Sequence, residues 1–308
     1  MKLVTTTADL AKYYTEKSIA APLEGIPATG FKHVDLSMYG IVYNGSPWLA
    51  AGDGWKIEVE KCMEAAECNG LDFCQAHSPC GNSFEPGDDK HDLILATKRS
   101  IEACGMLGIP HTVIHGQAIY GGTPKEFLQK NIEFCKLFEE DLERHNVNLL
   151  IENTASQWNP ECYVRTGREM REFVDSAGMP RLHICWDIGH GNVQGQNQYD
   201  DILIMGDELR ALHVQDNYGN ADSHIMPMAG TTNFDNVIRA LLKIGNKGDF
   251  TFEAGCTLRR AGAWPNYRRD IKDGDILANP PLYIQQKQQA VLYEIGKWML
   301  ESYNIAVE

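Results

Sequence analysis

The side chains best suited to chemistry follow short apolar runs of strand character. Leu182–Asn192 (LHICWDIGHGN) is the richest example, because its apolar run closes with Asp187 and His190 in a glycine-bearing turn. A carboxylate and an imidazole at the end of a buried strand suit a metal ion better than they suit packing. Other strand-like runs end in the same way, at His77, His115, Glu152, His213 and Glu253.

Short β-type runs alternate with longer amphipathic stretches along the chain, and no linker or low-complexity segment divides them. Eight such repeats in 308 residues predict a single (β/α)₈ TIM barrel of the α/β class. An open doubly wound sheet would usually show a Gly-rich turn after its first strand, and LVTTTADL has none. We expect one domain over 1–308, with an extended loop or arm at about 256–282 and a closing helix at 283–301. The expected strands are 2–7, 30–36, 71–77, 110–116, 147–153, 182–187, 209–215 and 249–254, and the other expected helices are 10–19, 55–68, 91–106, 125–145, 168–176 and 234–244.

The catalytic groups of a barrel come from the C-terminal ends of its strands. One histidine or carboxylate at a strand end is usually a cap, but six consecutive strands with such endings are hard to explain that way. Glu152, Asp187, His213 and Glu253 supply three carboxylates and one imidazole, a set that suits Mn²⁺, Mg²⁺ or Co²⁺ more than a structural zinc. Glu152 and Glu253 belong to strands five and eight, so they could face a metal-held substrate from opposite sides and exchange its proton.

Five motifs carry a family resemblance. IEN at 151–153, WDIGH at 186–190, LHVQDN at 212–217, DSHxxP at 222–227 and FEAG at 252–255 resemble the sugar isomerase/epimerase superfamily. This is the xylose-isomerase-like TIM-barrel group, which includes ketose 3-epimerases of the tagatose/psicose type, and the resemblance covers roughly 30–255. It implies one divalent metal ion, usually Mn²⁺, with Mg²⁺, Co²⁺ or Zn²⁺ as alternatives. The implied ligands are Glu152, Asp187, His213 and Glu253, with the two glutamates as the acid/base pair and His190 as a contact to substrate oxygens.

Other side chains at the same end of the barrel are candidates for substrate binding. His77 and His115 end strands three and four, and His224 lies in the loop after strand seven. Arg259 follows strand eight, where barrels often bind a phosphate or another anion. We therefore expect these four residues to contact the substrate.

The fold also hosts endonuclease-IV-type apurinic endonucleases, which hold a cluster of zinc ions. A net charge of −14, and loops at 39–54 and 78–90 without the basic residues of a DNA-binding groove, argue against nucleic acid as a partner. A metal-dependent lyase or dehydratase of an inosose or keto acid, and a catalytically silent sugar-binding barrel, remain open alternatives. The zinc-cluster pattern would match His77, His115, Glu152, Asp187, His190, His213, Asp222, His224 and Glu253.

The overall composition of the sequence indicates where the protein is located and which partners it could have. No run approaches the roughly 18 apolar residues of a membrane span, and MKLVTTTADLAKYY does not resemble a signal peptide. The nine cysteines are scattered without a CxxC pair, which indicates a reducing compartment and not a disulfide framework. We expect a cytoplasmic enzyme of small-molecule carbohydrates, without a membrane partner; a homo-oligomer, dimer or tetramer, is left open.

Overall fold

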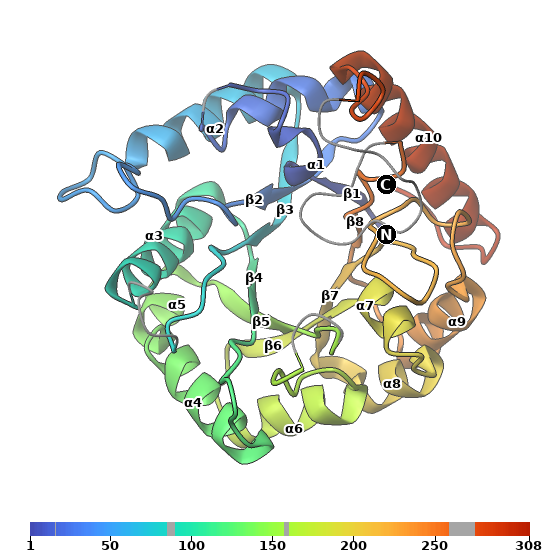
Figure 1. The fold of residues 1–308 in the computed structure, drawn as a ribbon. Coiled ribbons are helices and arrows are strands. Elements are labelled where there is room, and N and C mark those ends of the chain that lie inside the picture. Colours follow the sequence, from blue (N-terminus) through green and yellow to red (C-terminus); the bar gives the residue numbers. More distant parts are fainter. Residues whose placement is uncertain (16, 85–89, 157–159, 259–274) are drawn as a thin grey trace.

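The computed structural model describes residues 1–15, 17–84, 90–156, 160–258 and 275–308. Eight parallel strands form one sheet in the order β7-β6-β5-β4-β3-β2-β1-β8, surrounded by helices (Figure 1). Val214 closes the ring, because its N–H donates to the Thr251 carbonyl at 2.7 Å and its carbonyl accepts from the Glu253 N–H at 3.1 Å. The predicted (β/α)₈ barrel is confirmed. The strands are β1 (Leu3–Thr6), β2 (His33–Ser37), β3 (Asp72–His77), β4 (His111–His115), β5 (Asn148–Glu152), β6 (Leu182–Asp187), β7 (Leu209–His213) and β8 (Phe250–Phe252).

The helices agree with the sequence prediction over most of the chain. Capping boxes define the starts of two of them, since Thr123 pairs with Glu126 and Thr166 pairs with Glu169.

The two ends of the chain lie side by side, because the Met1 amino group donates a hydrogen bond to the Ala306 carbonyl at 2.9 Å. The helices are α1 (Ala8–Ala11), α2 (Lys56–Asn69), α3 (Lys90–Leu107), α4 (Pro124–Lys136), α5 (Glu139–His145), α6 (Gly167–Ala177), α7 (Ile188–Val193), α8 (Gln198–Met205), α9 (Phe234–Ile244) and α10 (Leu282–Glu301), with 3₁₀ segments η1 (Ala21–Thr29) and η2 (Gly206–Glu208).

Two helix predictions need correction, and two short helices were not predicted. The helix expected at 10–19 is only the four-residue α1, and the proline-containing η1 follows it. The helix expected at 125–145 is divided into α4 and α5, because the backbone leaves helical geometry at the buried Phe138, the N-cap of α5, where φ is −107° and ψ is −2°. The short helices α7 and α8 after β6 were not predicted, since the glycines and asparagines of this segment are poor helix formers.

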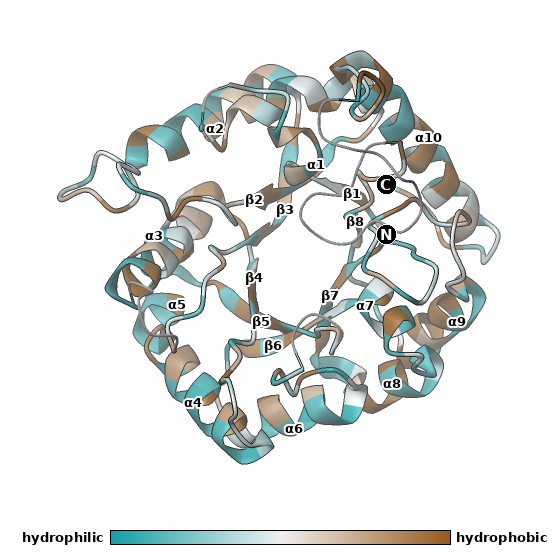
Figure 2. Ribbon diagram, viewed as in Figure 1, coloured by the Kyte–Doolittle hydropathy of each residue, from teal (hydrophilic) through white to brown (hydrophobic). Residues whose placement is uncertain are grey.

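Alternation along the strands builds two layers inside the barrel. Val113, Leu150, Cys185 and Ala211 are buried together as a small apolar cluster on β4 to β7. Because side chains two residues apart share a face of a strand, the next inward positions on these strands are His115, Glu152, Asp187 and His213. The strands and inner helix faces carry most of the hydrophobic residues (Figure 2), so an apolar floor supports a polar layer at the C-terminal mouth.

None of the helices in the described part of the chain combines the length and apolarity that crossing a membrane requires. The arm expected at about 256–282 falls largely on 259–274, which lie outside the described residues. The closing helix is present as α10.

Candidate metal centre

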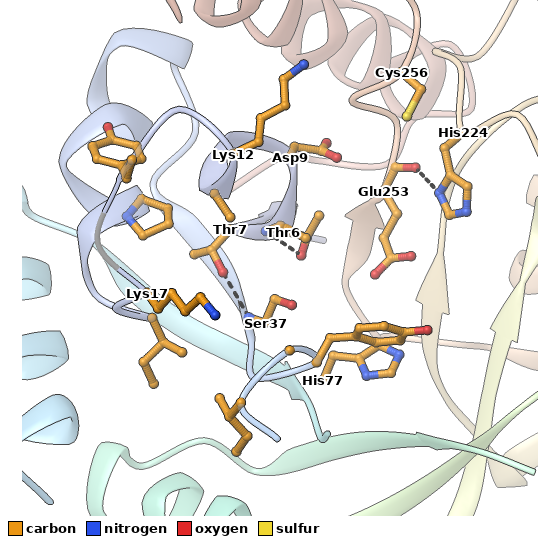
Figure 3. Close-up of a pocket in the computed structure, with 18 of the residues that line it drawn as sticks. Thr6, Thr7, Asp9, Lys12, Lys17, Ser37, His77, His224, Glu253 and Cys256 are labelled. Atoms are coloured by element: carbon orange, nitrogen blue, oxygen red, sulfur yellow. Dashed lines mark hydrogen bonds between the residues drawn. The ribbon is translucent and has the colours of Figure 1, made fainter. Parts of the chain in front are cut away.

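A pocket of about 740 Å³ opens over the polar layer, at the end of the barrel where the strands finish. In Figure 3, Glu253 and His77 line one side of this pocket, and Thr7 and Ser37 line the other. This volume lies well within the range of small-molecule binding sites, roughly 300–1,000 Å³. The predicted residues that line it are His77, His115, Glu152, His190, His224 and Glu253.

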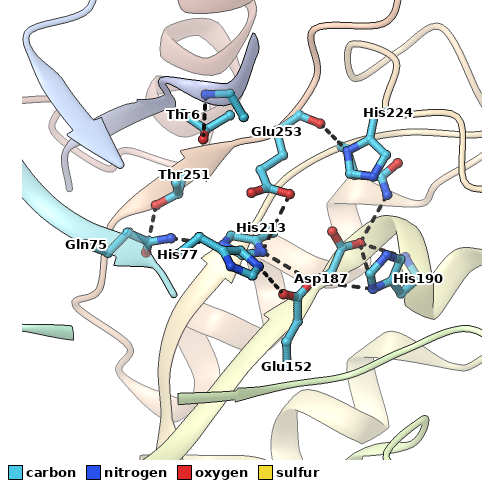
Figure 4. Close-up of polar contacts among 12 residues, drawn as sticks. Thr6, Gln75, His77, Glu152, Asp187, His190, His213, His224, Thr251 and Glu253 are labelled. Carbon is cyan, nitrogen blue, oxygen red and sulfur yellow. Dashed lines mark hydrogen bonds and ion pairs between the residues drawn. The ribbon is translucent and has the colours of Figure 1, made fainter. Parts of the chain in front are cut away.

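Glu152, at the end of β5, lies at the centre of the site. Its Oε2 is 3.0 Å from His115 Nε2 and 3.4 Å from His77 Nε2, and its Oε1 is 3.2 Å from His213 Nδ1 (Figure 4). Burial opposes ionisation of this carboxyl, but His213 and His115 outweigh it and hold the pKa of Glu152 well below its usual range. Glu152 is therefore an ionised carboxylate surrounded by imidazoles.

Asp187 ends β6 and is also the N-cap of α7. Its Oδ1 accepts a hydrogen bond from the His190 N–H at 2.7 Å, while its Oδ2 is buried and has no hydrogen-bond partner among the described residues. Asn153 fixes this strand end, since its side chain donates to the Asp187 carbonyl at 2.9 Å and accepts from the Asp187 N–H at 2.6 Å. Burial raises the pKa of Asp187 to about 6.

His190, on α7, points toward a second acidic group. Its Nδ1–H donates to the Asn153 carbonyl at 2.7 Å, and its Nε2 lies 3.4 Å from Asp222 Oδ2. Burial would lower the pKa of His190, but Asp187 and Asp222 raise it to about 9. The same oxygen of Asp222 is 3.0 Å from His224 Nε2, so one carboxylate joins two imidazoles.

Glu253, just after β8, is the more accessible of the two glutamates. Its side chain is 16% exposed and that of Glu152 is 1% exposed. Glu253 Oε2 lies 3.7 Å from His213 Nδ1, and its main-chain carbonyl accepts from His224 Nδ1–H at 2.8 Å. His213 Nδ1 thus faces both glutamates.

Two residues near this centre were not predicted. Asp35, inside β2, is fully buried, has no hydrogen-bond partner for either carboxylate oxygen among the described residues, and groups with His213 and Glu253. Burial raises its pKa to about 6. The signal in the sequence was an acidic residue within the predicted strand GFKHVDL. Tyr39, in the loop after β2, packs edge-on against the rings of His77 and His115 at 5.3 and 5.9 Å.

The described residues contain four groups of three candidate metal ligands. In each group the three ligand atoms lie within 4.8 Å of one another. The four predicted ligands are divided among these groups, and the contact between Glu152 and His213 connects them. The unpartnered Asp187 Oδ2, and His213 Nδ1 without a well-directed hydrogen bond, are the atoms that a divalent cation would satisfy. The donor set therefore fits a divalent metal. The groups are His77–His115–Glu152, Glu152–Asp187–His190, His190–Asp222–His224 and Asp35–His213–Glu253.

The structure brings together all of the predicted site residues that it describes. Arg259, predicted to contact substrate, lies outside the described residues. All nine positions of the zinc-cluster pattern also belong to the four groups. The sequence predicted which side chains meet here, and their division into groups follows from the three-dimensional arrangement.

Comparison with known proteins identifies the family. Residues 28–271 match the family described as "Xylose isomerase-like TIM barrel", and the chain belongs to this family. The resemblance predicted from the five motifs is confirmed.

The individual relatives share only a low sequence identity with this chain. A ketose 3-epimerase of Arthrobacter globiformis is 26% identical over 136 residues, which cover 42% of this chain and 44% of that protein. The chain thus matches less than half the length of this curated relative. Among solved structures, a D-tagatose 3-epimerase-like protein gives a TM-score of 0.71 at 19% identity, covering 99% of this chain and 98% of its own. The IOLI protein with a binding zinc atom gives 0.70 at 15% identity, covering 98% and 99%. At these identities, the structural likeness shows a shared fold.

Proposed function

We propose that this protein is a divalent-metal-dependent isomerase or epimerase of a sugar, sugar phosphate or polyol derivative. The observation that carries the proposal is the position of His213 Nδ1, which faces carboxylates from two different strands, Glu152 at 3.2 Å and Glu253 at 3.7 Å. A site that moves a proton from one carbon face to the other needs two such groups beside the substrate.

The division of labour follows from donor type and burial. Glu152, Asp187, His213 and Glu253 would hold the metal, with Mn²⁺ preferred. The bound ion would supply positive charge that polarises a substrate carbonyl and makes the neighbouring C–H more acidic. Glu253, exposed to the pocket, and Glu152, deeper in the barrel, would take the proton from carbon and return it on the opposite face.

The remaining polar residues of the pocket would orient the substrate. His190, with a pKa of about 9, is a hydrogen-bond donor at neutral pH and would contact a substrate oxygen. His77, His115 and His224 would bind further hydroxyl groups. Tyr39, which packs on His77 and His115, would present an apolar surface beside them.

The relatives support the same class of reaction. The curated relative is a ketose 3-epimerase, and one structural neighbour is a D-tagatose 3-epimerase-like protein. The zinc atom in the IOLI protein supports a metal in this fold. Cytoplasmic location is also part of the proposal, because the scattered cysteines without a CxxC pair favour a reducing compartment.

The decisive experiment is an assay of a sugar and polyol panel with Mn²⁺ in heavy water. An isomerase or epimerase would incorporate deuterium into recovered substrate or product, because the abstracted proton exchanges with solvent. The proposal would be wrong if the metal-loaded protein bound a sugar of the panel but gave neither deuterium incorporation nor product.

A dehydratase is the second candidate, favoured by His115. Although burial opposes its charge, Glu152 raises the pKa of this pocket-lining imidazole well above its usual value. A protonated imidazole beside the substrate could donate to a departing hydroxyl group. Loss of water from a polyol or keto acid in the same panel would identify this reaction.

A further inference from the structure

Gln75 is a buried amide directly beneath the metal centre. It lies on β3 two residues before His77, so its side chain belongs to the lower layer of the barrel interior. On β4 to β7 this layer is apolar, whereas β3 contributes Gln75 and β8 contributes the buried Thr251. Burying an amide or a hydroxyl costs free energy unless its hydrogen bonds are made. The buried Gln75 and Thr251 side chains therefore need hydrogen-bond partners at this depth.

The hydrogen bonds of Gln75 connect it to the metal site. Its Nε2 lies 3.0 Å from His213 Nε2, and its Oε1 accepts from Thr251 Oγ1 at 3.2 Å (Figure 4). All three side chains are 3% exposed or less. Within the described residues, the chain Thr251–Gln75–His213 spans strands β8, β3 and β7 and ends on a predicted metal ligand.

The two nitrogens of His213 have different neighbours. Nδ1 faces Glu152 and Glu253, whereas Nε2 lies 3.0 Å from the Gln75 amide nitrogen. The imidazole also interacts with the buried thiol of Cys185. A metal shared with the two glutamates must therefore bind at Nδ1. A neutral imidazole that gives its Nδ1 lone pair to a metal carries its proton on Nε2.

This protonation is incompatible with an amide N–H facing the ring, because two N–H donors would point at each other. A half-turn of the amide resolves the conflict by presenting Oε1 to the ring N–H. Thr251 permits both orientations, since its hydroxyl can donate to Oε1 or accept from the amide N–H. The pair can thus match either protonation state of His213 without leaving a buried polar atom unpartnered.

We propose that Gln75 is a positioning residue for the metal centre, and that Thr251 supports it. In the metal-bound protein, Gln75 Oε1 accepts the His213 Nε2–H and holds the ring with bare Nδ1 toward the ion. The inference rests on the proposed function only in taking His213 as a metal ligand. Such outer contacts orient ligands and raise their basicity, and their loss typically costs ~10–100-fold in metal affinity.

Metal affinity of matched variants tests the proposal, with Mn²⁺ titrated into each metal-free protein. Gln75→Leu should bind Mn²⁺ ~10–100-fold more weakly, whereas Gln75→Glu, which keeps an acceptor, should bind at least as tightly as the wild type. Thr251→Val should weaken binding and Thr251→Ser should restore it. Asn131→Leu removes another buried amide, one on α4 that bonds the main chain of Phe127 in the same helix and of Gln117 in the loop after β4, and should leave affinity unchanged.

A spectroscopic measurement needs no variant. In Zn²⁺-loaded protein labelled with ¹⁵N-histidine, the His213 Nε2–H should give a downfield signal that exchanges slowly with water. A rapidly exchanging Nε2–H in the loaded protein, or wild-type Mn²⁺ affinity in a folded Gln75→Leu variant, would overturn the proposal. Failure of the proposed function is distinguishable, because His213→Ala would then keep its metal.

Discussion

Glu152 Oε1 and His213 Nδ1 lie 3.2 Å apart, although the two residues are 61 positions apart in the sequence and the whole of β6 stands between their strands. Both side chains occupy the inward-facing layer above the apolar floor of Leu150 and Ala211. Their approach brings a fully buried carboxylate and a fully buried imidazole together without water between them. Buried polar groups at such depth must have their remaining atoms satisfied, and His213 Nδ1 and Asp187 Oδ2 have no hydrogen-bond partner among the described residues. A cation that replaces the imidazole proton would satisfy both atoms.

The two glutamates should separate proton transfer from metal binding. Glu152→Gln and Glu253→Gln keep a carbonyl oxygen for the ion but cannot exchange a proton with carbon. We expect each variant to lose at least ~100-fold in turnover, the scale of a lost general base, while retaining substantial metal and substrate affinity. Steady-state kinetics with parallel metal analysis would check this. Near wild-type turnover in either metal-loaded variant contradicts the acid/base assignment.

Metal content should distinguish one ion from a cluster. Protein purified without chelator should contain about one divalent ion per chain, given a set of three carboxylates and one imidazole. His213→Ala should lose most of this metal, whereas His111→Ala, on the same barrel at the opposite end of β4, should keep it. About three zinc ions per chain would instead support the zinc-cluster arrangement, because His77–His115–Glu152 and His190–Asp222–His224 form separate groups.

Metal affinity should fall in mild acid because of Asp187. Burial raises the pKa of Asp187 to about 6, against the opposing charges of His190 and His224 and reinforced by Glu152 and Asp222. The carboxylate binds the ion only when it is deprotonated, so protons compete with metal below that pH. His213 contributes proton competition over the whole interval, since burial lowers its pKa but Cys185, Glu253 and Glu152 raise it well above its usual value. Asp187 should add a further fall of about tenfold per pH unit below about 6, so the slope should steepen there. Mn²⁺ titrations between pH 5 and 7, flanking that value, would measure it.

A metal affinity that does not change with pH would contradict this prediction. An affinity that stays constant across this interval would show that Asp187 is ionised throughout or is not a ligand. Asp187→Asn is the control, because it removes the competing proton together with the carboxylate charge. Its binding should be weaker at neutral pH and should vary less with pH.

Strand periodicity accounts for how much of the site could be predicted from sequence. His115, Glu152 and Asp187 each end an apolar run, and once the eight repeats are read as a barrel, the strand ends must meet at one mouth. The predicted and observed bounds of β6 coincide, because a run buried on both faces ends sharply at Asp187. These patterns are local in the sequence, so they can be recognised without a three-dimensional structure.

The lower layer of the barrel could not be predicted in the same way. Gln75 and Asp35 stand inside strands, where a single polar residue does not reveal whether it faces solvent, helix or barrel interior. The roles of Gln75 and Asp35 depend on their proximity to His213. This histidine lies 138 positions from Gln75 in the sequence, but the side chains of the two residues are 3.0 Å apart in the structure. Helices α7 and α8 escaped prediction for a related reason, since α7 forms around Asp187 and glycines that its close packing requires.

Gly189 should show how tightly this packing constrains the centre. A Cβ at this position would lie 2.1 Å from the side-chain carbon Cδ of Gln215, which is fully buried. Gln215 cannot move freely, because its amide donates to the carboxylates of both Asp187 and Asp222. Gly189→Ala should therefore destabilise the protein by about 1–3 kcal/mol, the usual cost of overpacking. The displaced Gln215 should also weaken metal binding through Asp187.

Gly54→Ala is the matched control, since an added Cβ there would meet nothing within 4 Å. It should leave both the free energy of unfolding and the metal affinity unchanged. Denaturant unfolding of the metal-free proteins isolates the packing term, and Mn²⁺ titration of the folded proteins isolates the effect on the site. If Gly189→Ala loses stability but binds Mn²⁺ as the wild type does, Gln215 only fills space. If both quantities fall together, the Gln215 contact positions Asp187, and the glycine after the β6 carboxylate is required by the metal centre as well as by the turn.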